Sequence, residues 1–190
     1  MPERWCMHII RPLALLAVSA LAVLALAGPA FAAPAPCADA TTLPGQASER
    51  VLAKATVCLV NRERTRRGMR ALRVNRRLSQ AALSHTEDMV EKRYFEHVSK
   101  SGNSVVDRLL STGYLGGLRS WAVGENLAWG IDKLSTPRQT VTNWMDSPGH
   151  RANILNRRFR EIGIGVVFHA PNRTRDPVAA TYTTTFGYRR

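Results

Sequence analysis

The chain has 190 residues, a formal net charge of +13 at pH 7 and a hydrophobic fraction of 45%. This length suits one globular domain, and no internal repeat or long linker divides the sequence into two. The positive charge would suit nucleic acid, but no aromatic residues interleave with the arginines and no nucleic-acid-binding module is recognisable. We therefore expect no specific nucleic-acid partner.

The first 32 residues have the pattern of an export signal. Arg4 and Arg11 give a positive start, an apolar run follows from Leu13 to Ala27, and Ala30-Phe31-Ala32 is a small-x-small cleavage pattern. The apolar run is shorter than the roughly 20 residues of an ordinary membrane span. The sequence thus predicts a secreted protein with a Sec-type signal peptide at residues 1–32, and the alternative is a retained N-terminal anchor.

Two cysteines, Cys37 and Cys58, follow the predicted signal peptide. Residues 33–46 contain prolines, alanines and small polar residues and are predicted to form an N-terminal arm, whereas residues 47–190 form the domain. An even number of cysteines in an exported protein favours a disulfide, which here would tie the arm to the first helix. A loop of this length would stabilise the fold by about 3 kcal/mol. Two free thiols are the alternative.

Four helices are predicted from apolar residues that recur at helical spacing or from capping residues. They run from about Ala47 to Arg67, from Asn75 to about Arg93, from Ser104 to Thr112, and from Thr136 to a break at Pro148-Gly149. At the start of the fourth, Thr136 can cap, Pro137 suits the first helical position and Gln139 completes a capping box.

Strands are predicted where most of the residues at every second position are apolar. Glu161–Phe168 and Ala180–Gly187 have this pattern, and Val123–Trp129 is a candidate third strand. Helices then surround a small, mostly antiparallel sheet, which is an α+β fold.

Glu125 is the most informative ionisable residue. In a strand, its side chain would share a face with Val123, Leu127 and Trp129. Burying a carboxylate there is costly unless a cation or a hydrogen-bond donor meets it. The candidate partners are His97, His150, or a metal bound by all three residues.

Several motifs in the chain resemble those of one family. They are Phe95-Glu96-His97, Gly124-Glu125-Asn126-Leu127-Ala128, the run from Trp144 through Ser147-Pro148-Gly149-His150 to Leu155, and Glu161–Val166 with Thr185-Phe186-Gly187. In this order they are similar to the CAP superfamily of cysteine-rich secretory, antigen 5 and pathogenesis-related 1 proteins, in its bacterial secreted, SCP-like branch. The similarity extends from about Val51 to Gly187. It implies a three-layer α-β-α sandwich with a central cavity lined by histidines and acidic residues.

The resemblance also implies roles for individual residues. His97, Glu125 and His150 would line the cavity, and family members often hold Zn²⁺ or another divalent cation on the two histidines, with Glu125 as a third candidate ligand. Many eukaryotic members of the family have a second glutamate at the position where this chain has Ser147, beside Asp146. Adjacent helical residues point about 100° apart, so Asp146 does not automatically replace that glutamate. A hydrogen-bonded His–Glu–His cluster without metal is the alternative.

Two function classes follow. The first is a non-catalytic extracellular binding module, a monomer that takes a small apolar ligand between helices or contacts an anionic cell-wall or membrane surface. The arginines between residues 62 and 77 would serve that surface, unless they form only a solvated face. The alternative is a hydrolase of peptide or cell-wall material, with Glu125 or metal-bound water as the base and His150 as the electrophile.

Overall fold

The structure, a computed structural model, describes residues 35–117, 119–172 and 178–190. The predicted signal peptide therefore lies outside the described residues. The described residues from Pro36 to Arg190 belong to one compact unit. Within the described residues, no helix combines the length and the apolar character needed to cross a membrane.

The compact unit contains helices and strands in mixed order. They are α1 (Glu49–Thr65), β1 (Arg73–Val74), α2 (Arg76–Lys92), α3 (Val105–Ser111), β2 (Trp121–Ile131), the 3₁₀ helix η1 (Asp132–Ser135), α4 (Pro137–Asp146), α5 (Pro148–Ile154), β3 (Glu161–Phe168) and β4 (Ala179–Arg189). The sheet order is β1-β3-β4-β2. Pairing is antiparallel except between β1 and β3, so the prediction of a mostly antiparallel sheet is confirmed.

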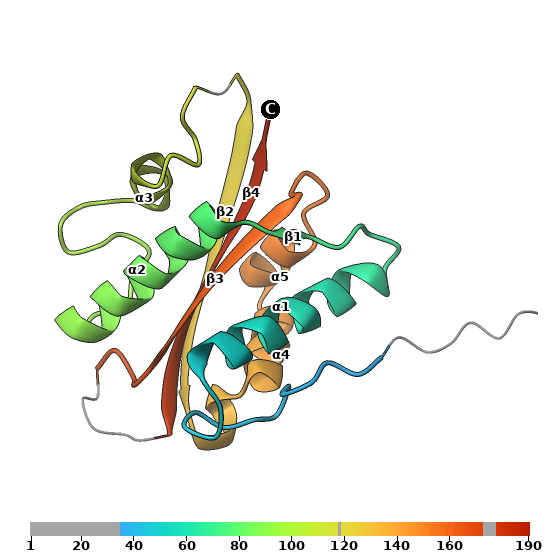
Figure 1. The fold of residues 1–190 in the computed structure, drawn as a ribbon, viewed down its shortest axis with the longest axis vertical. Helices are drawn as coiled ribbons and strands as arrows, with labels where there is room; N and C mark the ends of the chain where they lie inside the picture. Colours follow the sequence, from blue (N-terminus) through green and yellow to red (C-terminus); the bar gives the residue numbers. More distant parts are fainter. Residues whose placement is uncertain (1–34, 118, 173–177) are drawn as a thin grey trace, which may run out of the picture. The chain divides into compact units, whose positions relative to one another are not determined.

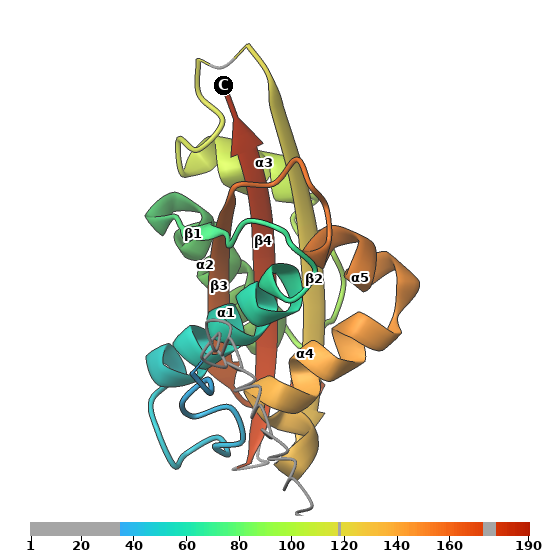
Figure 2. The same cartoon turned by 90° about the vertical axis from the view of Figure 1, so that its right-hand side faces the viewer.

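The elements form three layers. Helices α2 and α3 lie on one face of the sheet, and α1, α4 and α5 lie on the other (Figures 1 and 2). This is the α-β-α sandwich that the family resemblance implies. The larger hydrophobic core fills the second side, where Leu52, Trp144, Tyr182 and Phe186 are buried together.

On the other face, α2 packs directly against β3 because two glycines leave room for it. A Cβ on Gly163 would lie 2.1 Å from the backbone carbonyl carbon of Leu78, and one on Gly165 would lie 2.4 Å from the Cα of Leu83. The Thr185 hydroxyl donates to the Leu78 carbonyl at 2.9 Å. The alternating glycines of the predicted strand are therefore positions of close helix–sheet contact.

The predicted helix ends are largely confirmed. The Asn75 side chain caps α2, and the Thr136 hydroxyl accepts from the backbone N–H of Gln139 at 3.3 Å. The predicted capping box is wrong, because the Gln139 side chain donates to Asn143 instead. The chain does leave the helix at Ser147, but Pro148 then begins α5, since a proline suits the first turn of a helix.

The predicted disulfide is confirmed. Cys37 and Cys58 are bonded, with their Cα atoms 5.8 Å apart, and the bond joins the arm to α1.

The outermost strand is short. β1 pairs with β3 only through Arg73 and Val74, after which Asn75 caps α2 and the chain leaves the sheet. Among the described residues, most of the outer edge of β3 therefore lies between α1 and α2 without a neighbouring strand.

Candidate functional site

Glu125 lies in the middle of β2, on the face covered by α2 and α3. It pairs with Thr185 of β4, and its side chain is 3% exposed. Its carboxylate accepts from Arg108 Nη2 at 3.0 Å and 2.8 Å, and Oε1 lies 2.9 Å from Nδ1 of His97. A buried carboxylate is thus met by a guanidinium and an imidazole together.

Arg108, on α3, is the partner that sequence reasoning missed. It is 9% exposed and also donates to the carbonyls of His97 and Asn103, at 3.1 Å and 2.9 Å. The argument that Glu125 needs a cation was correct. The sequence contains one indication of this cation. Arg108 directly precedes Leu109 in a short predicted helix that has an apolar side.

His97 lies in the turn after α2 and is the exposed member of the cluster. Its side chain is 58% exposed, although its Nδ1 bonds to the buried Glu125. The second ring nitrogen is therefore the atom through which His97 could meet a ligand from solvent.

His150, in the first turn of α5, lies close enough to His97 to sense its charge. Burial lowers the pKa of His150 from its ordinary value, and a positive charge on His97 lowers it further. In the described part of the chain, the His150 ring makes no hydrogen bond to Glu125 or His97. The structure thus joins Glu125 to His97 directly and brings His150 only into electrostatic reach.

Two asparagines hold the backbone around His150. The Asn126 side chain donates to the His150 carbonyl at 3.1 Å, and Asn153 Nδ2 donates to Asn126 Oδ1 at 2.9 Å and to the Glu125 carbonyl at 3.1 Å. Gly124 is required beside them, because a Cβ there would lie 2.7 Å from Asn153 Oδ1. The Gly-Glu-Asn motif therefore links β2 to α5.

Asp146 and Ser147 take no part in this cluster. Asp146 is exposed and lines a cavity of about 310 Å³ together with Arg62, Glu63 and Arg66 of the α1 region. Ser147 is the residue between α4 and α5, and its N–H donates to the Asn143 carbonyl. The implied fourth cavity position thus brings no carboxylate to Glu125.

His85 is a packed histidine on α2, 1% exposed, which bonds through Nε2 to the Glu96 carbonyl at 3.0 Å. Burial lowers its pKa first, and the charge of Arg108 lowers it further.

The divalent cation that the resemblance implies needs donor atoms that are free to bind it. The carboxylate of Glu125 is already bound by Arg108, whose positive charge would repel a metal ion at the same oxygens. Among the described residues, no group of three or more His, Cys, Asp or Glu side chains is arranged to hold a metal ion. The three residues do not fit a shared metal site in this arrangement, and Zn²⁺ binding by the two histidines alone stays a prediction.

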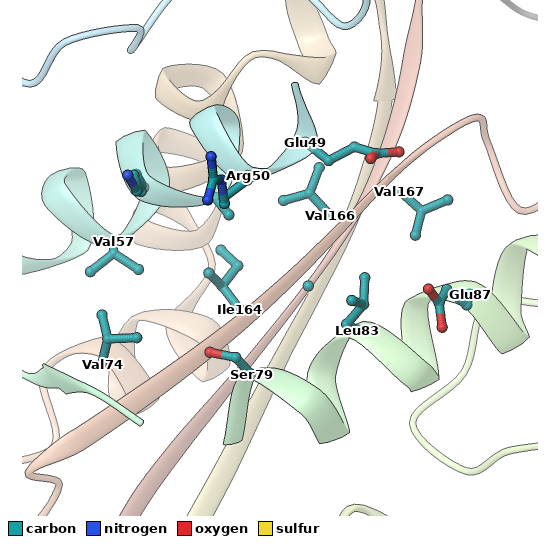
Figure 3. A pocket seen from close by; sticks show the side chains of 13 residues that line it. Glu49, Arg50, Val57, Val74, Ser79, Leu83, Glu87, Ile164, Val166 and Val167 are labelled. Carbon is teal, nitrogen blue, oxygen red and sulfur yellow. The ribbon is translucent and has the colours of Figure 1, made fainter. Parts of the chain in front are cut away.

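A second feature lies at the opposite edge of the sheet. An apolar groove of about 630 Å³ runs between α1 and α2 along the outer edge of β3 (Figure 3). Val57 of α1 and Val74 of β1 line one end, while Ile164 and Val166 of β3 and Leu83 of α2 line the middle. Val74 is 63% exposed and Leu83 is 40% exposed, and both line the same apolar groove instead of standing singly on the surface. We call this feature the β3 groove.

Charged residues lie along both sides of the β3 groove. Arg50 and Lys54 extend from α1, and Glu87 lies on α2. Glu49 accepts from the backbone N–H of Phe168, the last residue of β3, at 3.3 Å. The apolar part of the groove is therefore bordered by polar groups, as in many ligand pockets.

The family model described as "Cysteine-rich secretory protein family" (CAP) matches residues 57–186. The uncharacterised protein YkwD of Bacillus subtilis is 38% identical over 127 residues, which are 67% of this chain and 47% of that protein. The uncharacterised membrane protein YlbC of the same organism is 34% identical over 113 residues, 60% of this chain and 31% of that protein. The chain thus spans less than half the length of these relatives.

Solved structures share the fold. An extracellular SCP-domain protein from Bacillus anthracis has a TM-score of 0.60 and 27% identity, covering 73% of this chain and 40% of its own. An outer surface protein of Borrelia burgdorferi has a TM-score of 0.63 and 19% identity, covering 76% of this chain and 97% of its own.

Proposed function

Since the chain belongs to the cysteine-rich secretory protein (CAP) family, we propose that it is a non-catalytic, secreted binding module whose β3 groove takes a small apolar ligand of the acyl-chain type. The observation that carries this proposal is the groove itself. Its volume of about 630 Å³ lies within the range of small-molecule sites, and apolar side chains from α1, β1, α2 and β3 line it.

The exposure of Val74 and Leu83 supports a ligand in this place. Full burial of such an apolar side chain contributes about 1.5–3 kcal/mol, and each of these two partly exposed side chains forgoes a share of it. A ligand covering both, together with Ile164 and Val166 at the groove floor, would recover part of this free energy. Binding would therefore be driven mainly by removal of apolar surface from water.

The contacts of Glu125 favour binding over hydrolysis. A general base must reach the proton that it takes from water or substrate. The Glu125 side chain is 3% exposed, and its oxygens accept from Arg108 and His97. These contacts argue against Glu125 as the base, which is one of the two bases that the hydrolase alternative names.

The relatives support the proposed location. The Bacillus anthracis protein is described as extracellular, and the Borrelia protein as an outer surface protein. A disulfide between Cys37 and Cys58 is also typical of an oxidising compartment.

The proposal is tested with a fluorescent fatty acid titrated into the purified protein. We expect saturable binding by the wild type and a loss of about tenfold or more in Leu83→Arg, because a charge placed in the groove must be desolvated when the probe binds. Leu110→Arg is the matched control, since Leu110 is a 52% exposed leucine on α3, outside the groove. The control should bind like the wild type.

Two results would overturn the proposal. One is the absence of saturable binding by the wild type. The other is an equal affinity of Leu83→Arg and Leu110→Arg for the probe, which would place the fatty acid elsewhere on the surface.

A further inference from the structure

A third cavity, of about 300 Å³, lies where the end of α1 and the turn after it meet the connection between α5 and β3. It is lined by six residues, which are Arg64, Gly68, Met69, Arg70, Arg157 and Arg160. Four of the six are arginines, and neither an acidic nor an aromatic residue lines the cavity. We call it the arginine cavity.

Arg64 makes the arginine cavity a rigid feature. This residue is 1% exposed, and its guanidinium donates to the carbonyl of Arg70 at 2.9 Å, of Ile154 at 2.7 Å and of Asn156 at 3.0 Å. These bonds tie the turn after α1 to the connection that follows α5. The buried guanidinium of Arg64 thus joins the two walls of the cavity. Backbone carbonyls accept its hydrogen bonds, but they carry no net charge and do not neutralise it.

The positive charge around the cavity is uncompensated. Burial lowers the pKa of Arg64, and the charges of Arg160 and Arg157 lower it further, so these guanidinium groups repel one another. The acid nearest in sequence, Glu63, pairs with Arg66 and Arg67. Among the described residues, Arg64, Arg70, Arg157 and Arg160 have no carboxylate partner. An anion in the cavity would relieve this repulsion.

We propose that the arginine cavity binds a phosphate group of a phosphodiester polymer that carries no bases. Guanidinium groups match phosphate oxygens in geometry and charge, and several that line one hollow favour a tetrahedral anion. The charge also continues beyond the cavity, because residues 62–77 and 157–160 contain eleven arginines and one acid. A repeating anion can meet this extended charge, whereas a single phosphate ion cannot.

The lining favours a polymer without bases over nucleic acid. Proteins that bind single-stranded nucleic acid stack the bases on aromatic side chains beside a basic groove. The arginine cavity has no aromatic residue, and its apolar component is Met69. This inference does not depend on the β3 groove, because the two cavities share no residue.

The test measures binding of poly(glycerol phosphate) to the purified protein at low ionic strength. The double variant Arg157→Gln/Arg160→Gln should bind at least about tenfold more weakly than the wild type. Arg70→Gln, from the opposite wall, should weaken binding in the same direction. Arg93→Gln/Arg119→Gln is the matched control, since it removes the same charge from two exposed arginines outside the cavity and should change affinity by less than about twofold.

Circular dichroism should show the same fold in all variants, because the substituted arginines are exposed and Arg64 is retained. An equal loss in the cavity and control variants would overturn the proposal, because the whole surface charge would then be responsible. Tighter binding of single-stranded DNA or of anionic lipid vesicles than of poly(glycerol phosphate), with the same dependence on Arg157 and Arg160, would overturn the choice of polymer.

Discussion

The two edges of the sheet differ in whether an energetically costly group has a partner in the fold. At the β2 edge, the buried carboxylate of Glu125 is met by Arg108 and His97. At the β3 edge, apolar side chains such as Leu83 and Val74 stay in contact with solvent. Polar groups that satisfy one another stabilise the fold, whereas apolar groups left open retain free energy for a ligand. The difference supports our proposal that the polar cluster is architectural and that the groove takes the ligand.

The largest expected effect comes from breaking the ion pair at the β2 edge. Arg108→Met leaves Glu125 buried with His97 as its remaining side-chain partner, and we expect the free energy of unfolding to fall by about 3–5 kcal/mol. Urea denaturation followed by circular dichroism measures this change. The double variant Arg108→Met/Glu125→Leu removes both charges and should recover much of the loss. A single variant as stable as the wild type would show that the cluster is not architectural.

The link between β2 and α5 should be the next most sensitive position. Gly124→Ala places a Cβ 2.7 Å from Asn153 Oδ1 and 3.0 Å from Phe159 Cζ, which predicts a loss of about 1–3 kcal/mol. Gly149→Ala is the matched control, because no atom lies within 4 Å of its Cβ and the residue is helical. This control should be neutral or slightly stabilising in thermal denaturation. Equal losses in both variants would contradict the close approach.

A smaller effect concerns pH. Burial outweighs the attraction of Glu125 and Asp88, so the pKa of His85 is lowered in the folded state, and the charge of Arg108 acts in the same direction. Below the ordinary histidine pKa of about 6.5, His85 takes up a proton in the unfolded chain, whereas in the folded chain it does so only at lower pH. Stability should therefore fall as pH falls below this value, by at most about 1.4 kcal/mol per pH unit for one proton.

Urea denaturation at pH 7.5 and at pH 5.5 measures this dependence. His85→Gln keeps a donor for the Glu96 carbonyl and should lose less stability between the two pH values than the wild type. His169→Gln, at an exposed position after β3, should keep the wild-type dependence. The same dependence in His85→Gln as in the wild type would assign the effect to another group.

The smallest expected effect on stability is at the β3 groove. Leu83→Arg should change the free energy of unfolding by no more than about 0.5 kcal/mol, since Leu83 is already 40% exposed. The same variant should lose fatty-acid binding, so stability and affinity separate at this edge. A loss of several kcal/mol would mean that the groove is part of the core.

Much of the candidate site followed from local patterns and from the family resemblance. Glu125 among apolar neighbours in a strand required a partner, and His97 is one of the two histidines named for it. Arg108 could not be chosen from the sequence, because the chain has 27 lysines and arginines and their distance from Glu125 depends on how α3 lies over β2. For the β3 groove, the sequence predicted only that a small apolar ligand could lie between helices, and it indicated none of the residues that line the groove.

The sequence by itself determined four of the helices and the three long strands, the capping residues Asn75 and Thr136, the bond between Cys37 and Cys58, and the family, but not α5 or β1. These depend on residue spacing and on short motifs, which are visible along the chain. Only the tertiary structure decided which cation meets Glu125, where β1 stops along β3, and which four arginines share a cavity. Arg64 and Ile154, for example, are 90 residues apart and meet through one hydrogen bond. Such contacts depend on the packing of whole elements, and no local pattern encodes them.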